Sequence, residues 1–225
     1  MTFAKEAWPF VLPFVFLAAL LFVLGRPGWG AAALVVGLLV LLFFRDPARR
    51  YEGDAGVVLA AADGRVLGVD AIADPEIGDG RFHRVVTFLS VFDVHVQRVP
   101  AAGEVITSRT TAGRKVAAFR ADAEEVNEKH LTVIRRPGGD RVGVRQIAGL
   151  LARRVVCYLH EGDHVHRGQS LGLIKFGSRV DLLVPESYSV LVKKGDRLKN
   201  GATPVAVPSG SPLEAAAGAA PEAGR

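Results

Sequence analysis

Residues 171–185 read LGLIKFGSRVDLLVP, an apolar run that is interrupted by Gly177 and Ser178. A serine hydroxyl can attack the carbonyl of a preceding glycine and shift the acyl group from nitrogen to oxygen, because glycine lets the backbone reach the strained geometry required. The ester can then lose its carboxylate by β-elimination, and hydrolysis of the remaining dehydroalanine leaves a pyruvoyl group. A β-bulge is the alternative interpretation of a Gly-Ser pair within a strand. Self-cleavage is therefore indicated only if the chain also provides a base and hydrogen-bond donors for this reaction.

Such a cleavage needs a base for the hydroxyl proton and hydrogen-bond donors for the oxyanion. His95 lies within the apolar run FDVHVQRV, and Asp93 shares its strand face two residues earlier. Asp63 precedes a glycine in AADG. On these features alone, a histidine in a strand is more often structural, and an aspartate before glycine is more often a turn residue. Both residues are nevertheless the candidates for acid–base work.

Three further histidines lie close together: His160, His164 and His166. They belong to HEGDHVHRGQSLG at 160–172, which matches KKGDRLKNGATPV at 193–205 through the skeleton G-D-x-(V/L)-x-x-G. The second copy carries other basic residues at these positions: Lys193, Arg197 and Lys199. These positions therefore require only a basic, solvated side chain, and we expect no metal site.

Two uncharged runs, at 8–24 and 31–44, flank the turn-like GRPGWG. Each is slightly shorter than the roughly 20 residues of a full membrane span, so the sequence predicts a hydrophobic helical hairpin of two short spans or a re-entrant pair. A cleaved signal peptide is the alternative for the first run, but a second apolar run after a tight turn argues against it. The basic segment RDPARR at 45–50 places the following domain on the cytoplasmic face of the cell membrane.

Residues 51–207 alternate β-branched, aromatic and turn-forming residues and predict a β-rich domain. The repeated G-D-x-(V/L)-x-x-G segment resembles the hairpin turns of biotinyl- and lipoyl-type proteins, so we expect a mainly β fold with a duplicated β-sandwich or barrel. A short helix is also expected around 146–153. The tail at 208–225 is of low complexity and predicted to be disordered.

The net charge of +5 and the isoelectric point of about 9.7 favour anionic partners. No nucleic-acid-binding signature is present, so we expect an anionic membrane surface and no nucleic acid. The single cysteine, Cys157, excludes an internal disulfide framework and is interpreted as a small buried apolar residue.

The chain resembles phosphatidylserine decarboxylase proenzymes, specifically the short prokaryotic (archaeal-type) subfamily. The resemblance covers roughly residues 43–206 and depends on motifs in a fixed order: FFRDPARR, AADGRV, FLSVFDVHVQRVP, QIAGLLARRV, EGDHVHRGQSLGLIKFGSRVDLLVP and VKKGDRLKNGATPVA. Each motif is weak alone, and the ordered set is highly specific.

This resemblance implies self-cleavage between Gly177 and Ser178, into a β chain of residues 1–177 and an α chain of residues 178–225. Ser178 would become a pyruvoyl cofactor, and Asp63 and a histidine would complete a Ser-His-Asp arrangement for the cleavage. Many bacterial members carry two histidines three residues apart here. The first matches His95, and the second falls on Arg98.

An arginine stays protonated and cannot act as a general base. Either His95 therefore serves both cleavage and decarboxylation, or Asp63 acts more directly. Arg98 is then a candidate for binding the phosphate or carboxylate of the substrate.

The implied enzyme is a carboxy-lyase that converts phosphatidylserine to phosphatidylethanolamine and CO₂ through a Schiff base to the pyruvoyl group, without a metal. Its partners would be phosphatidylserine in the membrane and the β and α chains of the same precursor. Assembly into a homo-oligomer is left open. One alternative is a non-enzymatic, membrane-anchored lipoyl-like adaptor of an export pump, which should carry coiled-coil heptads that this chain lacks. Another is a pyruvoyl decarboxylase of a soluble amino acid, which leaves the hydrophobic hairpin unexplained.

Overall fold

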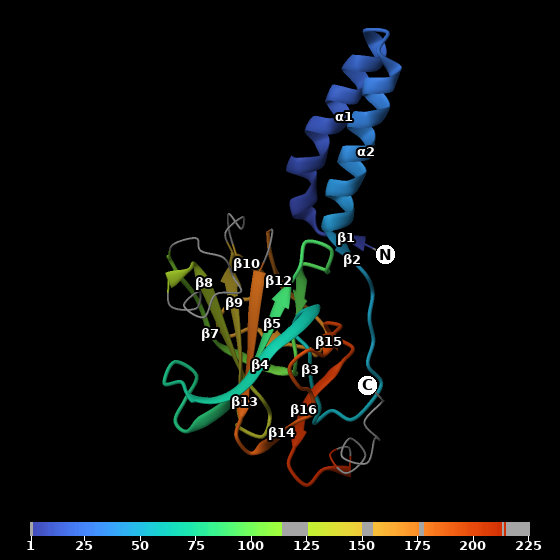
Figure 1. The fold of residues 1–225 in the computed structure, drawn as a ribbon. Helices are drawn as coiled ribbons and strands as arrows, with labels where there is room; N and C mark the ends of the chain where they lie inside the picture. Colours follow the sequence, from blue (N-terminus) through green and yellow to red (C-terminus); the bar gives the residue numbers. More distant parts are fainter. Residues whose placement is uncertain (1, 114–125, 150–154, 176–177, 213, 215–225) are drawn as a thin grey trace.

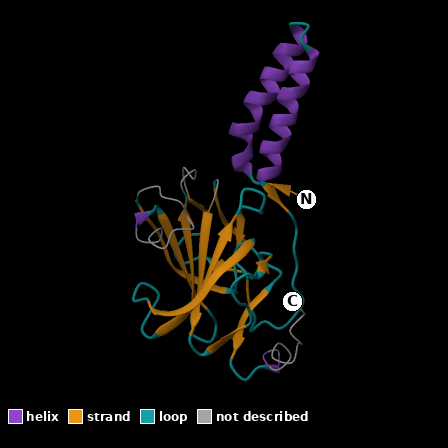
Figure 2. Ribbon diagram, viewed as in Figure 1, coloured by secondary structure: helices purple, strands orange, loops and turns teal. Residues whose placement is uncertain are grey.

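The computed structural model describes residues 2–113, 126–149, 155–175, 178–212 and 214. Figures 1 and 2 show a helical hairpin that projects from one end of a β-rich body. The two predicted uncharged runs form the hairpin helices, α1 (Trp8–Val23) and α2 (Pro27–Phe43). The predicted fold class, mainly β with an N-terminal helical hairpin, is confirmed.

The hairpin helices contact each other through small residues and expose apolar side chains outward. A Cβ added at Gly30 would lie 3.0 Å from the Phe22 ring, and one at Gly37 would lie 3.1 Å from Phe14. This close approach is typical of helices that associate in lipid. By length and composition, the segment Lys5–Val23 could cross a membrane, whereas α2 has 17 residues.

A short ladder closes the base of the hairpin. The strand β1 (Thr2–Phe3) pairs antiparallel with β2 (Arg45–Asp46), which directly follows the second helix. The 3-10 helix η1 (Lys5–Ala7) leads from β1 into α1. Both ends of the hairpin are thereby held together where it meets the β-rich body.

An antiparallel, curled sheet of eight strands forms most of the body, in the order β11-β7-β8-β9-β13-β5-β4-β15. Two three-stranded sheets, β10-β12-β6 and β14-β16-β3, complete it. In chain order the strands are β3 (Val58–Leu59), β4 (Gly64–Ala73), β5 (Arg81–Leu89), β6 (Val96–Arg98), β7 (Gly103–Thr111), β8 (Lys129–Arg135), β9 (Arg141–Ala148), β10 (Val155–Cys157), β11 (His164–Val165), β12 (Ser170–Ile174), β13 (Ser178–Pro185), β14 (Tyr188–Val190), β15 (Arg197–Leu198) and β16 (Pro204–Pro208).

The strand β13 lies at the centre of the large sheet, between β9 and β5, and is buried on both faces. Val180, Leu182 and Val184 face the main hydrophobic core, whereas Leu183 belongs to a second cluster on the opposite face. A strand that is covered on both sides needs apolar residues at successive positions. This requirement explains why the sequence of β13 is nearly continuous in aliphatic residues.

The internal repeat corresponds to two equivalent turns at the two ends of the large sheet. The amide of Gly162 donates to Val105 O at 2.8 Å, and the amide of Gly195 donates to Val66 O at 2.8 Å. Both glycines have positive φ, +88° and +99°, which glycine adopts without steric cost. After the turns, β11 pairs with β7 and β15 pairs with β4. The kinship of this arrangement with biotinyl and lipoyl domains stays a prediction.

The histidines of the first repeat, His160, His164 and His166, are exposed. Within the described ranges, no cluster of three or more His, Cys, Asp or Glu side chains is arranged to hold a metal. Cys157 is partly buried and packs against the main core.

The prediction of a short helix around 146–153 is wrong for residues 146–148. Residues 146–148 belong to β9, where Gln146 pairs with His130 on one side and with Val180 on the other. Strand pairing on both sides overrides the local helix preference of this stretch. Residues 150–154 lie outside the described residues, as does most of the tail predicted to be disordered.

The close contact of β12 with β10 gives a test of the fold. A Cβ at Gly172 would lie 2.1 Å from the backbone oxygen of Val156, so Gly172→Ala must push the strands apart. We expect a loss of roughly 1–3 kcal/mol in the free energy of unfolding, measured by thermal or denaturant unfolding in detergent. Gly68→Ala is the matched control, because a Cβ there meets nothing within 4 Å. Equal stability of the two variants would contradict the strand contact.

Candidate functional site

Ser178 is the first residue of β13 and pairs with Leu89 of β5 and Ala148 of β9. Its side chain is on the same face as Val180 and therefore points toward the main core. The residue is 0% exposed, and its Oγ has no hydrogen-bond partner among the described residues. A buried hydroxyl without a partner costs free energy and suggests a functional role. Gly177, the other half of the predicted scissile bond, lies outside the described residues.

His95 immediately precedes β6 and is only 1% exposed. Its Nδ1 lies 2.9 Å from the backbone oxygen of Asp93. Because a carbonyl can only accept, this hydrogen-bond network assigns the proton to Nδ1 and a lone pair to Nε2. Burial, chiefly, lowers the pKa of His95 to about 4. The ring is therefore neutral at physiological pH, and its Nε2, which has no partner in the described structure, is available as a proton acceptor.

The fold brings the two residues to one region: His95 contacts Phe43 at the base of the hairpin, and Ser178 pairs with Leu89, the last residue of β5, from which residues 90–94 lead to His95. The amide of Ile174, the last residue of β12, donates to the backbone oxygen of His95 at 3.4 Å. Ser178 starts β13 four residues later in the chain. The segment that contains the predicted scissile bond thus connects the strand beside His95 to the central strand of the sheet.

The base of the hairpin covers His95. The ring of Phe43, the last residue of α2, lies 4.1 Å from the imidazole between centroids. Phe44 contacts Phe43 edge-on and stacks on Phe10 of α1, with centroids 5.1 and 5.6 Å apart. Leu173 of β12 belongs to the same hydrophobic cluster. The membrane-type hairpin therefore supplies part of the apolar surface that removes His95 from water.

Asp63 is placed near this site but is bound to other groups. Its carboxylate forms an ion pair with Arg49 and accepts from the amide of Asn200 at 2.8 Å. No hydrogen bond joins the described residues Asp63 and His95. The connection is indirect, because the Asn200 side chain donates to the backbone oxygen of Val96, the residue after His95. In the described structure the predicted Ser-His-Asp arrangement is therefore not joined by hydrogen bonds: Ser178 Oγ and His95 Nε2 have no described partner, and Asp63 is linked through Asn200 only to the backbone beside His95.

Arg98 lies at the end of β6, and its guanidinium contacts protein groups. It forms an ion pair with Asp46 and donates to the backbone oxygens of Gly168, at 2.7 Å, and Pro47, at 3.2 Å. These bonds connect β6 to the segment that follows the hairpin. Its role in binding substrate stays a prediction.

Two buried glutamines beside His95 were missed by the sequence analysis. Gln97 donates to the backbone oxygen of His95 at 2.8 Å, and Gln146 donates to the side-chain oxygen of Gln97 at 2.9 Å. Gln146 shares the core-facing side with Ser178, and its Oε1 has no partner among the described residues. The available signal was a single side-chain amide in each of two strands rich in β-branched residues, VHVQRV and VRQIAG.

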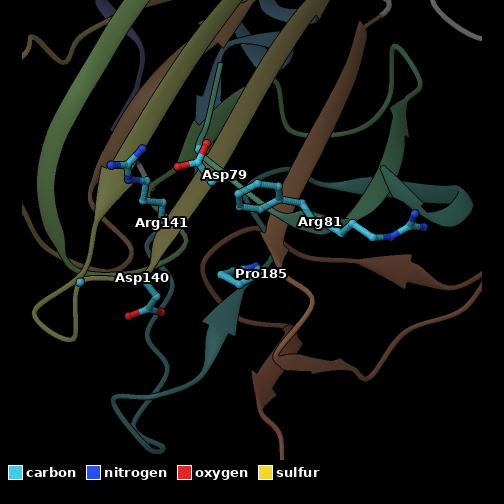
Figure 3. Close-up of a pocket in the computed structure, with 8 residues that line it drawn as sticks. Asp79, Arg81, Asp140, Arg141 and Pro185 are labelled. Carbon is cyan, nitrogen blue, oxygen red and sulfur yellow. The ribbon is translucent and has the colours of Figure 1, made fainter. Parts of the chain in front are cut away.

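A cavity of about 330 Å³ opens at the other end of β13, near Pro185 (Figure 3). Its charged lining residues come from two turns and from the first residues of the strands that follow them: Asp79 before β5 and Arg81 at its start, and Asp140 before β9 and Arg141 at its start. In the close-up, Arg81 extends away from the other three. None of the predicted site residues lines this cavity, so it is separate from the site around Ser178.

Comparisons with known proteins identify the family of this chain. A sequence model of the family described as phosphatidylserine decarboxylase matches residues 36–206. The phosphatidylserine decarboxylase proenzyme of Symbiobacterium thermophilum is 45% identical over 203 residues, which cover 89% of this chain and 93% of the relative. The proenzyme of Nitrosomonas europaea is 40% identical over 195 residues, with 87% and 90% covered. The chain therefore belongs to the phosphatidylserine decarboxylase family.

Proposed function

We propose that this chain is a proenzyme that cleaves itself between Gly177 and Ser178 and then decarboxylates phosphatidylserine to phosphatidylethanolamine and CO₂. The observation that carries the proposal is the buried Ser178 Oγ without a described partner, at the same end of the body as a neutral histidine with a free Nε2. The curated relatives are named phosphatidylserine decarboxylase proenzymes. An export-pump adaptor or an amino-acid decarboxylase is not favoured by this relationship.

The residues present fit a pyruvoyl group at position 178. That group would occupy the first position of β13, where the Ser178 side chain is fully buried and makes no described hydrogen bond that its conversion would break. Once formed, it supplies a carbonyl that condenses with a substrate amine and draws electrons from the carbon that loses CO₂. The protein then requires no metal or separately bound coenzyme for this reaction.

Self-cleavage can be assigned to the chain's own residues. His95 Nε2 accepts the proton of Ser178 Oγ while Oγ bonds to the Gly177 carbonyl carbon, and the proton passes to the departing amide nitrogen. The same base then removes the Cα proton as the Gly177 carboxylate leaves. The amino-acrylate that remains becomes an imine, and water converts it to the ketone with release of ammonia.

The two chains would stay together after cleavage because of the sheet topology. β13 is held by ladders to β5 and β9, which belong to the other chain. β15 pairs with β4, and β16 pairs with β3, across the same boundary. The product is one folded unit composed of two chains, residues 1–177 and 178–225.

The hairpin places the proposed reaction at a membrane surface. Its outward side chains are apolar, and its base directly contacts His95. A lipid substrate would therefore meet this end of the body while its acyl chains remain in the bilayer. We assign the domain to the cytoplasmic face on the basis of Arg45, Arg49 and Arg50 next to the hairpin.

Replacing the serine tests the cleavage. Ser178→Ala should remain a single chain and lack decarboxylase activity, because no hydroxyl is present to attack Gly177. Intact mass and denaturing gels should show two chains for the unmodified protein, with the smaller one beginning in a blocked group. Ser189→Ala, a partly buried serine of β14, should be processed normally. A single unprocessed chain in the unmodified protein would refute the proposal.

Replacing the proposed base tests its role. We expect His95→Gln to slow self-cleavage by about 100-fold or more, since positioned general bases typically contribute that much. The rate can be followed on gels after cell-free synthesis of the precursor. His83→Gln in β5 serves as the control, because His83 is partly buried and lies toward the other end of that strand. Processing of His95→Gln at the normal rate would remove His95 from the site.

The pH dependence of cleavage tests the burial of His95. Because its pKa is about 4, the base form persists well below neutral pH, and the rate should fall only as the pH approaches 4. Phe43→Ala exposes the ring to water and should move this fall to higher pH, toward the ordinary histidine value of about 6.5. Precursor shifted to buffers of different pH provides the measurement. Identical profiles for both proteins would mean that Phe43 does not shield His95.

A further inference from the structure

Two adjacent apolar side chains are exposed in the loop that leads from β5 to His95, here called the 90–94 loop. Phe92 is 84% exposed and Val91 is 46% exposed. Beyond residue 44, the only other large apolar side chain that is exposed in the described structure is Val69, at 37%. Soluble surfaces rarely present a bulky aromatic side chain so fully next to a second apolar one.

The 90–94 loop is held in a defined turn that presents these side chains. The Asp93 carboxylate accepts from the amide of Ser90 at 2.8 Å and from its hydroxyl at 2.6 Å. Arg197 of β15 donates to the same carboxylate at 3.2 Å. Arg45, directly after the hairpin, donates to the backbone oxygen of Phe92. The turn is therefore fixed to both the sheet and the base of the hairpin.

Its location suggests what covers it. The loop after β5 lies beside the base of the hairpin, whose axis leads away from the body (Figure 1). When the hairpin is in a bilayer, this end of the body is the one nearest the lipid. Basic side chains lie at this end: Arg197, which contacts the loop, has a side chain that is 69% exposed, and Lys5 and Lys175 lie at the hairpin base, where Lys5 is exposed and Lys175 contacts Phe10. Such residues attract anionic head groups.

We propose that Val91 and Phe92 insert into the surface of a bilayer containing anionic lipid and form a second membrane contact beside the hairpin. This inference rests on the proposed function, since it gives the site its access to a lipid substrate. The 90–94 loop directly precedes His95 in the chain, so insertion of its tip brings the bilayer surface close to the end of the body where His95 is buried. The hairpin anchors the chain, and the loop sets the orientation of the body on the membrane.

A kinetic comparison tests the proposal. Phe92→Ser is compared with Val69→Ser on two substrates, phosphatidylserine in vesicles and a short-chain phosphatidylserine that is monomeric in water. The ratio of kcat/KM for vesicles to kcat/KM for monomers should fall about tenfold for Phe92→Ser, because a buried aromatic contact is lost. The ratio should be unchanged for Val69→Ser, which lies in the middle of β4. An unchanged ratio for Phe92→Ser would overturn the proposal.

A second measurement reports insertion without activity. Phe92→Cys, in a Cys157→Ser background, is labelled with an environment-sensitive fluorophore and placed in nanodiscs of phosphatidylcholine and phosphatidylserine. Lipids brominated on their acyl chains should quench this label and leave a label at Val69→Cys unchanged. Absence of quenching would mean that the loop faces water and would refute insertion. Shielding of the label that increases with protein concentration would mean that a second copy of the chain covers the loop, and it would also refute insertion.

The outcomes for the two proposals are distinguishable. A protein that neither cleaves itself nor decarboxylates either form of phosphatidylserine would refute the proposed function, whereas quenching would still report insertion of the 90–94 loop. A protein that processes and decarboxylates normally, with no quenching and an unchanged ratio, would refute only the loop proposal.

Discussion

The pairing of β13 between β5 and β9 is the constraint on which the rest of the structure depends. It makes β13 the most enclosed strand of the large sheet, and it fixes Ser178 at the start of that strand, where the hydroxyl is fully buried. Ladders on both sides specify the position of Ser178 more strongly than a loop could. The side chain proposed to attack is thereby set on a rigid element, and the bond proposed to break directly precedes it in the chain.

A second contact connects this rigid element to the membrane-type hairpin. Phe43 covers the imidazole of His95, and Leu173 of β12 belongs to the same cluster. The hairpin thus supplies one side of the apolar surroundings of His95. Removing water from His95 favours its neutral form, which is the form that a general base requires. The apolar surface at the base of the hairpin consequently contributes to the local electrostatics of His95.

Much of this arrangement could be predicted from the sequence, since uncharged runs and alternating β-branched residues reflect burial directly. Ser178, His95 and Asp63 could be singled out because their chemistry is unusual for their apolar or turn-like surroundings. The contact of Phe43 with His95 could not, because it joins residues that are distant in the chain. Gln97 and Gln146 were missed because one amide in an apolar strand does not reveal its partner. The stretch at 146–148 was assigned to a helix because two-sided pairing is not a local property.

The two equivalent turns of the internal repeat differ at the position that Asp63 occupies in one of them. Val165 and Leu198 occupy the same position in the two copies of the repeat, and they pair with Gly103 and Gly64. Ala102, before Gly103, is therefore the counterpart of Asp63, before Gly64. The turn beside β7 therefore forms with an alanine at this position, whereas the turn beside β4 has a carboxylate there that pairs with Arg49. That carboxylate connects its turn to the segment after the hairpin, a contact that an alanine cannot make.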